Sequence, residues 1–441
     1  MTDMKNLDAH ELEKQRTGWM RRYQAFQSRN LQIDMTRGKP CAEQLDLALG
    51  MLDCVDREHY RAADGTDCRN YGGLDGIPEA KRLFAAYMEV APDEVIVGGN
   101  SSLNMMYDAI ARAMIHGVAD GAIPWGQLPA VKFLCPSPGY DRHFAICEHM
   151  GMAMIPVEMK DDGPDMDQVE ALVAGDESIK GMWCVPKYSN PTGATYADQV
   201  VERLAAMRTK AQDFRVFWDN AYAVHHLTET PDPLQDVLVA CKRAGNPDRV
   251  LLFGSTSKVS LAGAGLAMMA GSVQNVAWAK KHMAVQTIGP DKLNQLRHVR
   301  FFKDMAGIEA HMRRHAAILK PKFDAVQEVL ERELGPQGAA GQPALGLASN
   351  GCSLVAWSKP NGGYFVSLDT PDGCARAVVD MAARAGVKLT PAGSTFPYKQ
   401  DPRDRNIRIA PSFPPVEDIR VAMEVVAVCV QLAGLDRRMG R

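Results

Sequence analysis

Short apolar runs alternate along much of the chain with longer segments in which apolar residues recur at helical spacing. Such runs are typical of strands in a sheet that is buried on both faces, and the segments between them are typical of helices. The pattern therefore predicts an α/β domain. The expected strands are residues 94–97, 131–135, 152–157, 181–185, 215–218, 249–253 and 265–271.

Three segments carry strong helix signals. Residues 7–26 place apolar side chains at helical spacing, and Asp8 can cap this helix together with the acidic residue three positions later. Residues 76–90 form a second expected helix, with Pro78 suited to its first turn. A third, long helical region is expected over about residues 299–334.

A connector rich in Gly, Ala and Pro, residues 335–351, follows the third helical region. Beyond it, residues 362–370 and 386–393 are expected to form strands. The change of composition at the connector predicts a smaller domain in the C-terminal part of the chain.

Five of the seven apolar runs end in an unusual polar phrase. In open α/β sheets, ligands bind at the carboxyl ends of the strands, so these phrases are expected to converge on one pocket. One phrase alone would be weak evidence, but five in succession indicate a binding site. The phrases are GGNSS (98–102), PSPGY (136–140), PKYSNPTG (186–193), DNAY (219–222) and GSTSK (254–258).

Composition and charge narrow the functional classes. The chain has 441 residues, enough for two domains, and a formal net charge of −3 with both signs interspersed. This distribution does not favour nucleic acid or an anionic membrane as a partner. The N-terminal residues lack the apolar run of a signal peptide, and the ten cysteines form no CxxC pair. We therefore expect a cytoplasmic protein with reduced thiols.

Seven motifs follow one another in a distinctive order: Tyr71, NSS (100–102), Tyr140, NPTG (190–193), DNAY (219–222), STSK (255–258) and NIRIAP (406–411). This order resembles that of fold-type I aminotransferases, which use pyridoxal 5′-phosphate, and is most similar to bacterial aspartate aminotransferases of subgroup Ic. The resemblance runs from residue 35 to about residue 415.

The resemblance implies two domains. A large domain is expected to contain a mostly parallel seven-stranded sheet, and a smaller α+β domain is expected from the N- and C-terminal segments. The expected boundaries are residues 1–50 for the N-terminal segment of the small domain, 51–320 for the large cofactor-binding domain and 321–441 for the C-terminal small domain.

The resemblance also assigns roles around the cofactor ring. Lys258 is expected to bond covalently to the cofactor aldehyde, to be displaced by the substrate amine and to move a proton between the substrate Cα and C4′ of the cofactor. Asp219 is expected to keep the pyridine nitrogen protonated, so that the ring can accept electrons. Tyr222 and Asn190 suit hydrogen bonds to the ring's phenolic oxygen. Tyr140 is placed to stack on the ring.

The cofactor phosphate is expected at the start of the helix that follows the first strand. Ser101 and Ser102 offer hydroxyl groups and free amides there, which together form an anion site. A plain serine cap of the helix is the alternative. Ser255 and Ser257, on either side of Thr256, are further expected contacts of the cofactor.

The phosphate site also brings in a second subunit and shows one departure from the family. Tyr71 matches the residue that reaches the phosphate from the neighbouring subunit, which implies a homodimer with shared active sites. Most relatives carry an arginine eight residues after the lysine, where it neutralises the phosphate, whereas this chain has Leu266. Either another cation takes over, or hydroxyls, amides and the helix dipole suffice.

Substrate recognition is expected to depend on cations. Arg408 matches the family's receptor for the α-carboxylate, which a guanidinium can hold with two parallel hydrogen bonds. Gly38 resembles a glycine whose backbone approaches the substrate. Lys292 and Arg297 lie where relatives carry residues that reach into the partner's site, so either could bind an acidic substrate side chain. Each is equally well a charged loop residue, and one could instead replace the phosphate arginine.

These features predict an aminotransferase that works by a ping-pong cycle, with L-aspartate and 2-oxoglutarate as the expected substrates. The alternatives are a transaminase for aromatic or neutral donors, or a β-lyase or decarboxylase with the same cofactor. Arg408 would retain the α-carboxylate and so argues against decarboxylation. A transcription regulator on the same fold would need a basic recognition helix, which the N-terminal segment lacks. His225 and His226 have no further ligands at useful spacing, so no metal site is expected.

Overall fold

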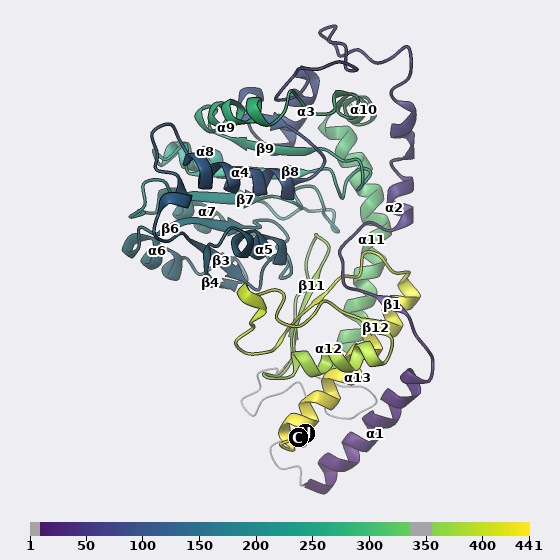
Figure 1. Cartoon of the computed structure of the whole chain (residues 1–441). Coiled ribbons are helices and arrows are strands. Elements are labelled where there is room, and N and C mark those ends of the chain that lie inside the picture. Colours follow the sequence, from purple (N-terminus) through teal and green to yellow (C-terminus); the bar gives the residue numbers. More distant parts are fainter. Residues whose placement is uncertain (1–8, 336–354) are drawn as a thin grey trace. The chain divides into compact units, whose positions relative to one another are not determined.

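The computed structural model describes residues 9–335 and 355–441, and its elements are labelled in Figure 1. The chain divides into two compact units. We call Ala42–Ser189 with Ala194–Ala316 the sheet unit, and Met1–Cys41 with Asn190–Gly193 and Ala317–Arg441 the terminal unit. The terminal unit thus includes the four residues of the NPTG motif.

The sheet unit is built on one mixed sheet of eight strands in the order β2-β9-β8-β7-β6-β3-β4-β5. Seven of the strands coincide with the predicted apolar runs, which confirms that prediction. The eighth, β5, has two residues and pairs antiparallel with the end of β4, so it is too short to give a periodic signal. The strands are β2 (Val95–Val97), β3 (Lys132–Ser137), β4 (Ala153–Lys160), β5 (Gly163–Pro164), β6 (Ile179–Cys184), β7 (Arg215–Asp219), β8 (Val250–Ser255) and β9 (Ala267–Gly271).

Strand direction decides which strand ends meet. Strands β4, β3, β6, β7 and β8 are parallel to their neighbours in this series, whereas β9 is antiparallel to both β8 and β2. Strand β2 therefore runs in the same direction as β8. The carboxyl ends of β2, β3, β6, β7 and β8 lie at one edge of the sheet, and these are the strands that the five polar phrases follow.

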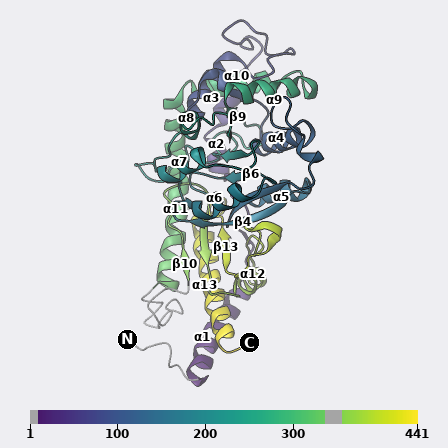
Figure 2. The ribbon, with the colours of Figure 1, turned by 90° about the vertical axis from the view of Figure 1, so that its left-hand side faces the viewer.

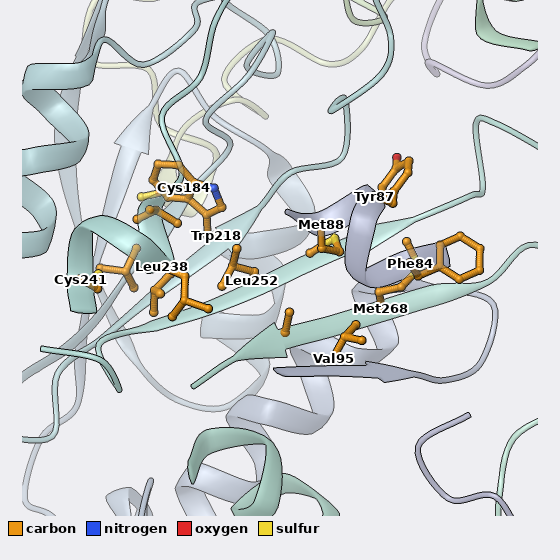
Figure 3. Close-up of a cluster of buried hydrophobic side chains, with 14 of the residues drawn as sticks. Phe84, Tyr87, Met88, Val95, Cys184, Trp218, Leu238, Cys241, Leu252 and Met268 are labelled. Atoms are coloured by element: carbon orange, nitrogen blue, oxygen red, sulfur yellow. The ribbon is translucent and has the colours of Figure 1, made fainter. Parts of the chain in front are cut away.

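Alternate residues of the central strands point to opposite faces of the sheet and enter two apolar clusters. Trp218 and Leu252 belong to one cluster, and the adjacent Phe217 and Phe253 belong to the other. Figure 3 shows the first cluster, where strand side chains meet those of helices α3 (Pro78–Met88) and α8 (Val237–Arg243). Both faces are apolar, so the strands read as continuous hydrophobic runs and not as alternating ones.

Helix α3 begins at Pro78, and this confirms the predicted helix and the place of its proline. The remaining helices of the sheet unit are α2 (Ala42–Asp46), α4 (Ser102–His116), α5 (Asp141–His149), α6 (Met166–Gly175), α7 (Asp198–Ala206), α9 (Val273–Gln286) and α10 (Lys292–Phe302). Among the described residues, none of the helices combines the length and the apolar character that crossing a membrane requires.

The long helical region predicted over about residues 299–334 is confirmed, but it comprises the end of one helix and the whole of another. Helix α10 ends at Phe302, and α11 (Met305–Leu334) begins three residues later. Lys303 between them has a φ of 68°, a left-handed conformation that ends a helix. The Oδ1 atom of Asp304 then accepts a hydrogen bond from the amide of Gly307 at 2.9 Å, which caps the new helix.

The terminal unit combines helices with two small sheets. Strands β10, β11 and β13 form an antiparallel sheet, and β1 pairs in parallel with β12. Helices α1 and α12 both contact the long, buried α13, and Figure 2 shows α12 and α13 side by side. The elements are α1 (Ala9–Gln27), β1 (Ile33–Asp34), the rest of α11, β10 (Ala356–Trp357), β11 (Val366–Asp369), α12 (Ala375–Arg384), β12 (Val387–Lys388), β13 (Asn406–Ile409) and α13 (Val416–Arg438).

The fold class predicted from the sequence is confirmed, with a mostly parallel sheet as its central element. The predicted helix over residues 7–26 is α1. Its proposed cap, Asp8, lies outside the described residues, as does the connector beyond Gly335.

Candidate active site

Lys258 lies in the loop that joins β8 to β9, directly beyond the carboxyl end of β8. Its Nζ atom lies 5.1 Å from the centroid of the Tyr222 ring. Burial lowers the pKa of the Lys258 amine, and the negative charge of Asp219 partly offsets this effect. A larger share of the amine is therefore uncharged at neutral pH than for a surface lysine, and an uncharged amine can act as a nucleophile or a base.

Asp219 is the last residue of β7, the strand next to β8, and only 2% of it is exposed. Its Oδ2 atom accepts a hydrogen bond from Nε2 of His143 at 3.1 Å. Its Oδ1 atom is buried and has no hydrogen-bond partner among the described residues. A buried carboxylate oxygen without a donor is costly. The geometry therefore calls for a hydrogen-bond donor at this position.

The sequence did not single out His143, although it lies three residues after Tyr140 in the first turn of α5. Its ring stacks on that of Trp183, with centroids 4.4 Å apart and an interplanar angle of 10°. The ring of Tyr140 meets it edge to face at 4.9 Å. Because an ionised carboxylate can only accept, the proton of His143 is on Nε2, and the stacking fixes the direction of its hydrogen bond to Asp219.

Ser101 and Ser102 begin helix α4, as predicted from the helix signal. Ser101 precedes the first turn in an extended conformation, and its side chain forms no capping hydrogen bond. The hydroxyl of Ser257 donates to the carbonyl of Asn100 at 3.2 Å. The structure thus joins the Lys258 loop to the N-terminus of α4, where first-turn amides and hydroxyls can bind an anion.

Leu266, at the position where most relatives have an arginine, is buried in the apolar core. Its amide donates to Oγ1 of Thr256 at 2.8 Å, and its carbonyl accepts from the amide of Thr256 at 2.8 Å. The residue therefore serves packing and local backbone geometry, and it brings no charge to the start of α4.

Tyr71 is 83% exposed, and Lys292 binds the main chain on either side of it. The Nζ atom of Lys292 donates to the carbonyls of Asn70 and Gly72 at 2.5 and 2.7 Å. Lys292 itself is only 3% exposed, and its partners in the described part of the chain are carbonyls and not carboxylates. We call residues 70–73 the Tyr71 segment.

Arg297 lies on the same helix as Lys292 and is half-buried. Its Nε atom donates to Oδ1 of Asn294 at 2.7 Å, and the Asn294 amide donates to the carbonyl of Gly265 at 2.9 Å. Two cations that the sequence could not distinguish thus have different surroundings: Lys292 is committed to main-chain carbonyls, and Arg297 is held through one nitrogen.

Arg408 lies in β13 of the terminal unit and is buried. Its guanidinium donates to Oδ1 of Asn190 at 3.3 Å and to Oγ1 of Thr390 at 3.4 Å, and it lies 4.9 Å from the centroid of the Phe365 ring. Gly38 packs against the same ring so closely that an added Cβ would lie 2.5 Å from the Phe365 Cζ atom. The unit therefore brings Arg408, Asn190 and Gly38 into one cluster.

Comparison with known proteins places the chain in one family. A family model described as aspartate amino-transferase matches residues 7–441. The chain is 48% identical to an aspartate aminotransferase of Corynebacterium glutamicum over 416 residues, which are 94% of this chain and 93% of the relative. It is also 48% identical over 436 residues to a putative aminotransferase of Mycolicibacterium smegmatis, covering 98% and 97% of the two chains.

Solved structures agree with the sequence relatives. The crystal structure of an aspartate transaminase from Corynebacterium glutamicum matches with a TM-score of 0.92 and 46% identity, over 99% of both chains. An α-aminoadipate aminotransferase from Thermus thermophilus, complexed with N-(5′-phosphopyridoxyl)-L-leucine, shares the fold at 19% identity, with a TM-score of 0.70 over 95% of each chain. This chain belongs to the aspartate aminotransferase family, within the fold-type I transaminases that depend on pyridoxal phosphate.

Proposed function

We propose that the protein is an aspartate transaminase that moves the amino group of L-aspartate to 2-oxoglutarate through pyridoxal 5′-phosphate, in two half-reactions. The observation that carries the proposal is the pairing of Lys258 and Asp219 at the ends of adjacent strands, with a buried Asp219 oxygen that has no donor among the described residues. Family membership supports the reaction class.

The residues of the sheet unit fit this cofactor. Oδ1 of Asp219 suits the protonated pyridine nitrogen, and the amine of Lys258 suits the aldehyde. The Tyr222 hydroxyl suits the phenolic oxygen, and the Tyr140 ring suits the ring face. The phosphate suits the N-terminus of α4, with hydroxyls from Ser101, Ser102, Ser255 and Ser257. When bound, the cofactor supplies an electron sink for the carbanion formed at the substrate Cα.

The protein's own groups then have distinct tasks. The Lys258 amine, whose pKa burial lowers, would take the proton from the substrate Cα and return it to C4′ of the cofactor, two atoms along. The carboxylate of Asp219 would hold a proton on the ring nitrogen by charge. His143 is a positioning residue, because its hydrogen bond fixes the carboxylate plane.

Substrate recognition is proposed to use two cations. Arg408 would hold the α-carboxylate, since a buried guanidinium has the bidentate geometry that this group requires. A transaminase must retain this carboxylate, which separates it from a decarboxylase. For the distal carboxylate of aspartate we favour Arg297 over Lys292, because two main-chain carbonyls already engage the Lys292 ammonium.

We also propose a homodimer in which Tyr71 serves the partner's cofactor. Tyr71 is 83% exposed, although Lys292 holds the main chain next to it. Without a partner subunit, its large aromatic ring would remain in water. Its hydroxyl could donate to a phosphate, which partly offsets the missing arginine at position 266.

The test is a panel of amino acids added singly to the purified holoenzyme while its visible absorbance is followed. Aspartate should convert the bound cofactor to its amino form faster than alanine, phenylalanine or leucine, and 2-oxoglutarate should reverse the change. A preference for aromatic or small neutral donors would overturn the aspartate assignment. Release of ammonia and a keto acid in place of the amino form would indicate a β-lyase.

A further inference from the structure

Three buried histidines from separate segments bind the short stretch that carries Lys258. We call residues 256–260 the Lys258 loop. His225 follows β7, His298 lies in α10 and His311 lies in α11, and all three are at most 5% exposed. None of them was assigned a role in cofactor or substrate binding from the sequence.

His298 binds the two hydroxyls at the ends of the loop. Its Nδ1 atom lies 2.7 Å from the carbonyl of Asn294, which can only accept, so Nδ1 carries the proton. Nε2 of the uncharged ring is then an acceptor, and it lies 3.2 Å from Oγ1 of Thr256 and 2.9 Å from Oγ of Ser260. Those two hydroxyls are themselves 3.0 Å apart. One imidazole thus ties the start of the loop to its end.

His311 and His225 bind the carbonyls in the middle of the loop. Nε2 of His311 lies 2.8 Å from the carbonyl of Val259, and Nε2 of His225 lies 3.3 Å from the carbonyl of Lys258. Both nitrogens must therefore carry protons and donate. Nε2 of His315 lies 3.0 Å from Nε2 of His311, and Nδ1 of His315 lies 3.0 Å from the side-chain amide nitrogen of Gln44.

The histidines are uncharged under ordinary conditions. Burial lowers the pKa of His298 to about 4 and that of His315 to about 3. It also lowers the pKa of His311 and of His225, and the charge of Lys258 contributes at His225. An arginine or lysine could donate to the same carbonyls, but it would place a permanent positive charge beside the Lys258 amine.

We propose that His298 and His311 are positioning residues for Lys258, which hold its main chain still while the side chain forms and releases its bond to the cofactor. The amine must change partners during each half-reaction, so the backbone that carries it has to remain in one place. Uncharged imidazoles supply this support without disturbing the ionisation of the amine. The inference rests on the proposed function.

The main test replaces His311 by Leu and by Gln in the full-length holoenzyme. Leucine fills a similar volume but has no donor, whereas the glutamine amide can still donate to the Val259 carbonyl. For His311→Leu we expect about tenfold weaker binding of pyridoxal phosphate, and the pH midpoint of the bound cofactor's visible absorbance should move by more than about 0.5 unit. His311→Gln should remain within about threefold of the wild type in affinity and keep the midpoint.

A milder variant, Ser260→Ala, tests the same inference if the His311 variants fail to fold. It removes only the hydroxyl that lies 2.9 Å from Nε2 of His298, and we expect about threefold weaker cofactor binding. The matched control is His226→Leu. His226 hydrogen-bonds Oη of Tyr188 at 2.9 Å and shares the histidine chemistry, but its hydrogen bond is made outside the Lys258 loop.

Failure of the positioning role and failure of the proposed function give different results. If the wild-type protein binds no pyridoxal phosphate, the proposed function fails. If the wild type binds the cofactor and both His311→Leu and Ser260→Ala match it in affinity and in absorbance midpoint, the positioning role is wrong. Equal shifts in His226→Leu, or failure of His311→Gln to restore the wild-type midpoint, would also overturn it.

Discussion

The Lys258 loop and the Tyr71 segment are both held by basic side chains that donate to main-chain carbonyls. The donors differ in charge, and the two stretches of chain differ in exposure. Around Lys258 the donors are buried, uncharged imidazoles. Beneath Tyr71 the donor is the ammonium of Lys292. The loop must keep a reactive amine free of neighbouring positive charge, whereas the segment presents an exposed tyrosine that we expect to meet a phosphate.

The Tyr71 segment tolerates a buried positive charge next to it, and the Lys258 loop has none among its three histidine partners. Lys292 has no carboxylate partner among the described residues, so its charge is stabilised only by carbonyl dipoles. An anion bound nearby would improve that balance, and the cofactor phosphate is the anion that the proposed dimer would supply. A similar charge near Lys258 would lower the pKa of its amine further and change its chemistry.

The largest expected effect comes from the loop itself. Lys258→Ala should lower kcat by at least about 1,000-fold, because it removes both the nucleophile and the base. Some cofactor should still bind through its ring and phosphate, which equilibrium dialysis against pyridoxal phosphate would measure. Turnover near that of the wild type would rule out Lys258 as the reactive lysine.

Asp219→Asn should lower kcat by about 100-fold or more, with a smaller loss of cofactor affinity, because the neutral amide no longer holds a proton on the ring nitrogen. Steady-state kinetics with aspartate would measure this. His143→Asn offers a graded comparison, since it removes the hydrogen bond to Oδ2 and the stacking on Trp183 but keeps the carboxylate, and it should cost about tenfold. An unchanged kcat in Asp219→Asn would mean that another group protonates the ring.

The Tyr71 segment should respond in binding more than in chemistry. Tyr71→Phe should weaken cofactor binding by about tenfold, because a hydrogen bond to a charged phosphate is lost. At a cofactor concentration that leaves Tyr71→Phe largely without cofactor, its mixtures with Lys258→Ala should gain activity, since one site of each mixed dimer would contain both wild-type residues. If the mixtures stay inactive although mixed dimers form, Tyr71 serves its own chain.

Arg297 and Lys292 can be separated by their substrates. Arg297→Met should lower kcat/KM for aspartate by about 30-fold and change it little for alanine, because only aspartate has a distal carboxylate. Lys292→Met should weaken cofactor retention equally for all donors, since it loosens the segment beneath Tyr71. The reverse pattern would assign the distal carboxylate to Lys292.

The smallest effect concerns acid stability. The pKa values of about 4 for His298 and about 3 for His315 lie below the ordinary value of about 6.5. The unfolded chain therefore binds protons first as the pH falls, so the stabilisation is complete above about pH 6.5 and is lost below it. Each histidine should lower the free energy of unfolding by up to about 1.4 kcal/mol per pH unit between pH 6 and 5.

Urea denaturation at several pH values would measure this slope, and His298→Gln should make it shallower. An equal slope in the variant would show that the pKa of His298 is the same in the folded and unfolded states. The same series with His226→Gln should also give a shallower slope, because burial lowers the pKa of His226 to about 4. His226 lies outside the Lys258 loop, so this effect is independent of that loop.

Much of the fold could be predicted from local pattern. The seven apolar strands and the start of α3 are confirmed, because strand burial and helix starts leave signals within a few residues. The family that the order of the motifs indicated is confirmed as well. The break between α10 and α11 was missed. It depends on one left-handed residue, Lys303, which no hydrophobic period reveals.

The assigned roles of the site residues stay predictions, but the sequence by itself determined which chemical groups the chain carries at the ends of its strands. Lys258 and Asp219 follow apolar runs directly, and parallel strands bring such ends to one edge of the sheet. The absence of an arginine at position 266 was also visible in the sequence.

Only the tertiary structure decided which groups meet. It set His143 against Asp219, put the Lys292 ammonium beneath the Tyr71 segment and surrounded the Lys258 loop with histidines. These pairs are separated by 33 to 222 residues. Their contact depends on strand order and on how helices pack against the sheet, and neither leaves a periodic mark in the sequence. The tautomers and the lowered pKa values follow from that packing, because burial acts on a side chain only once the chain has folded around it.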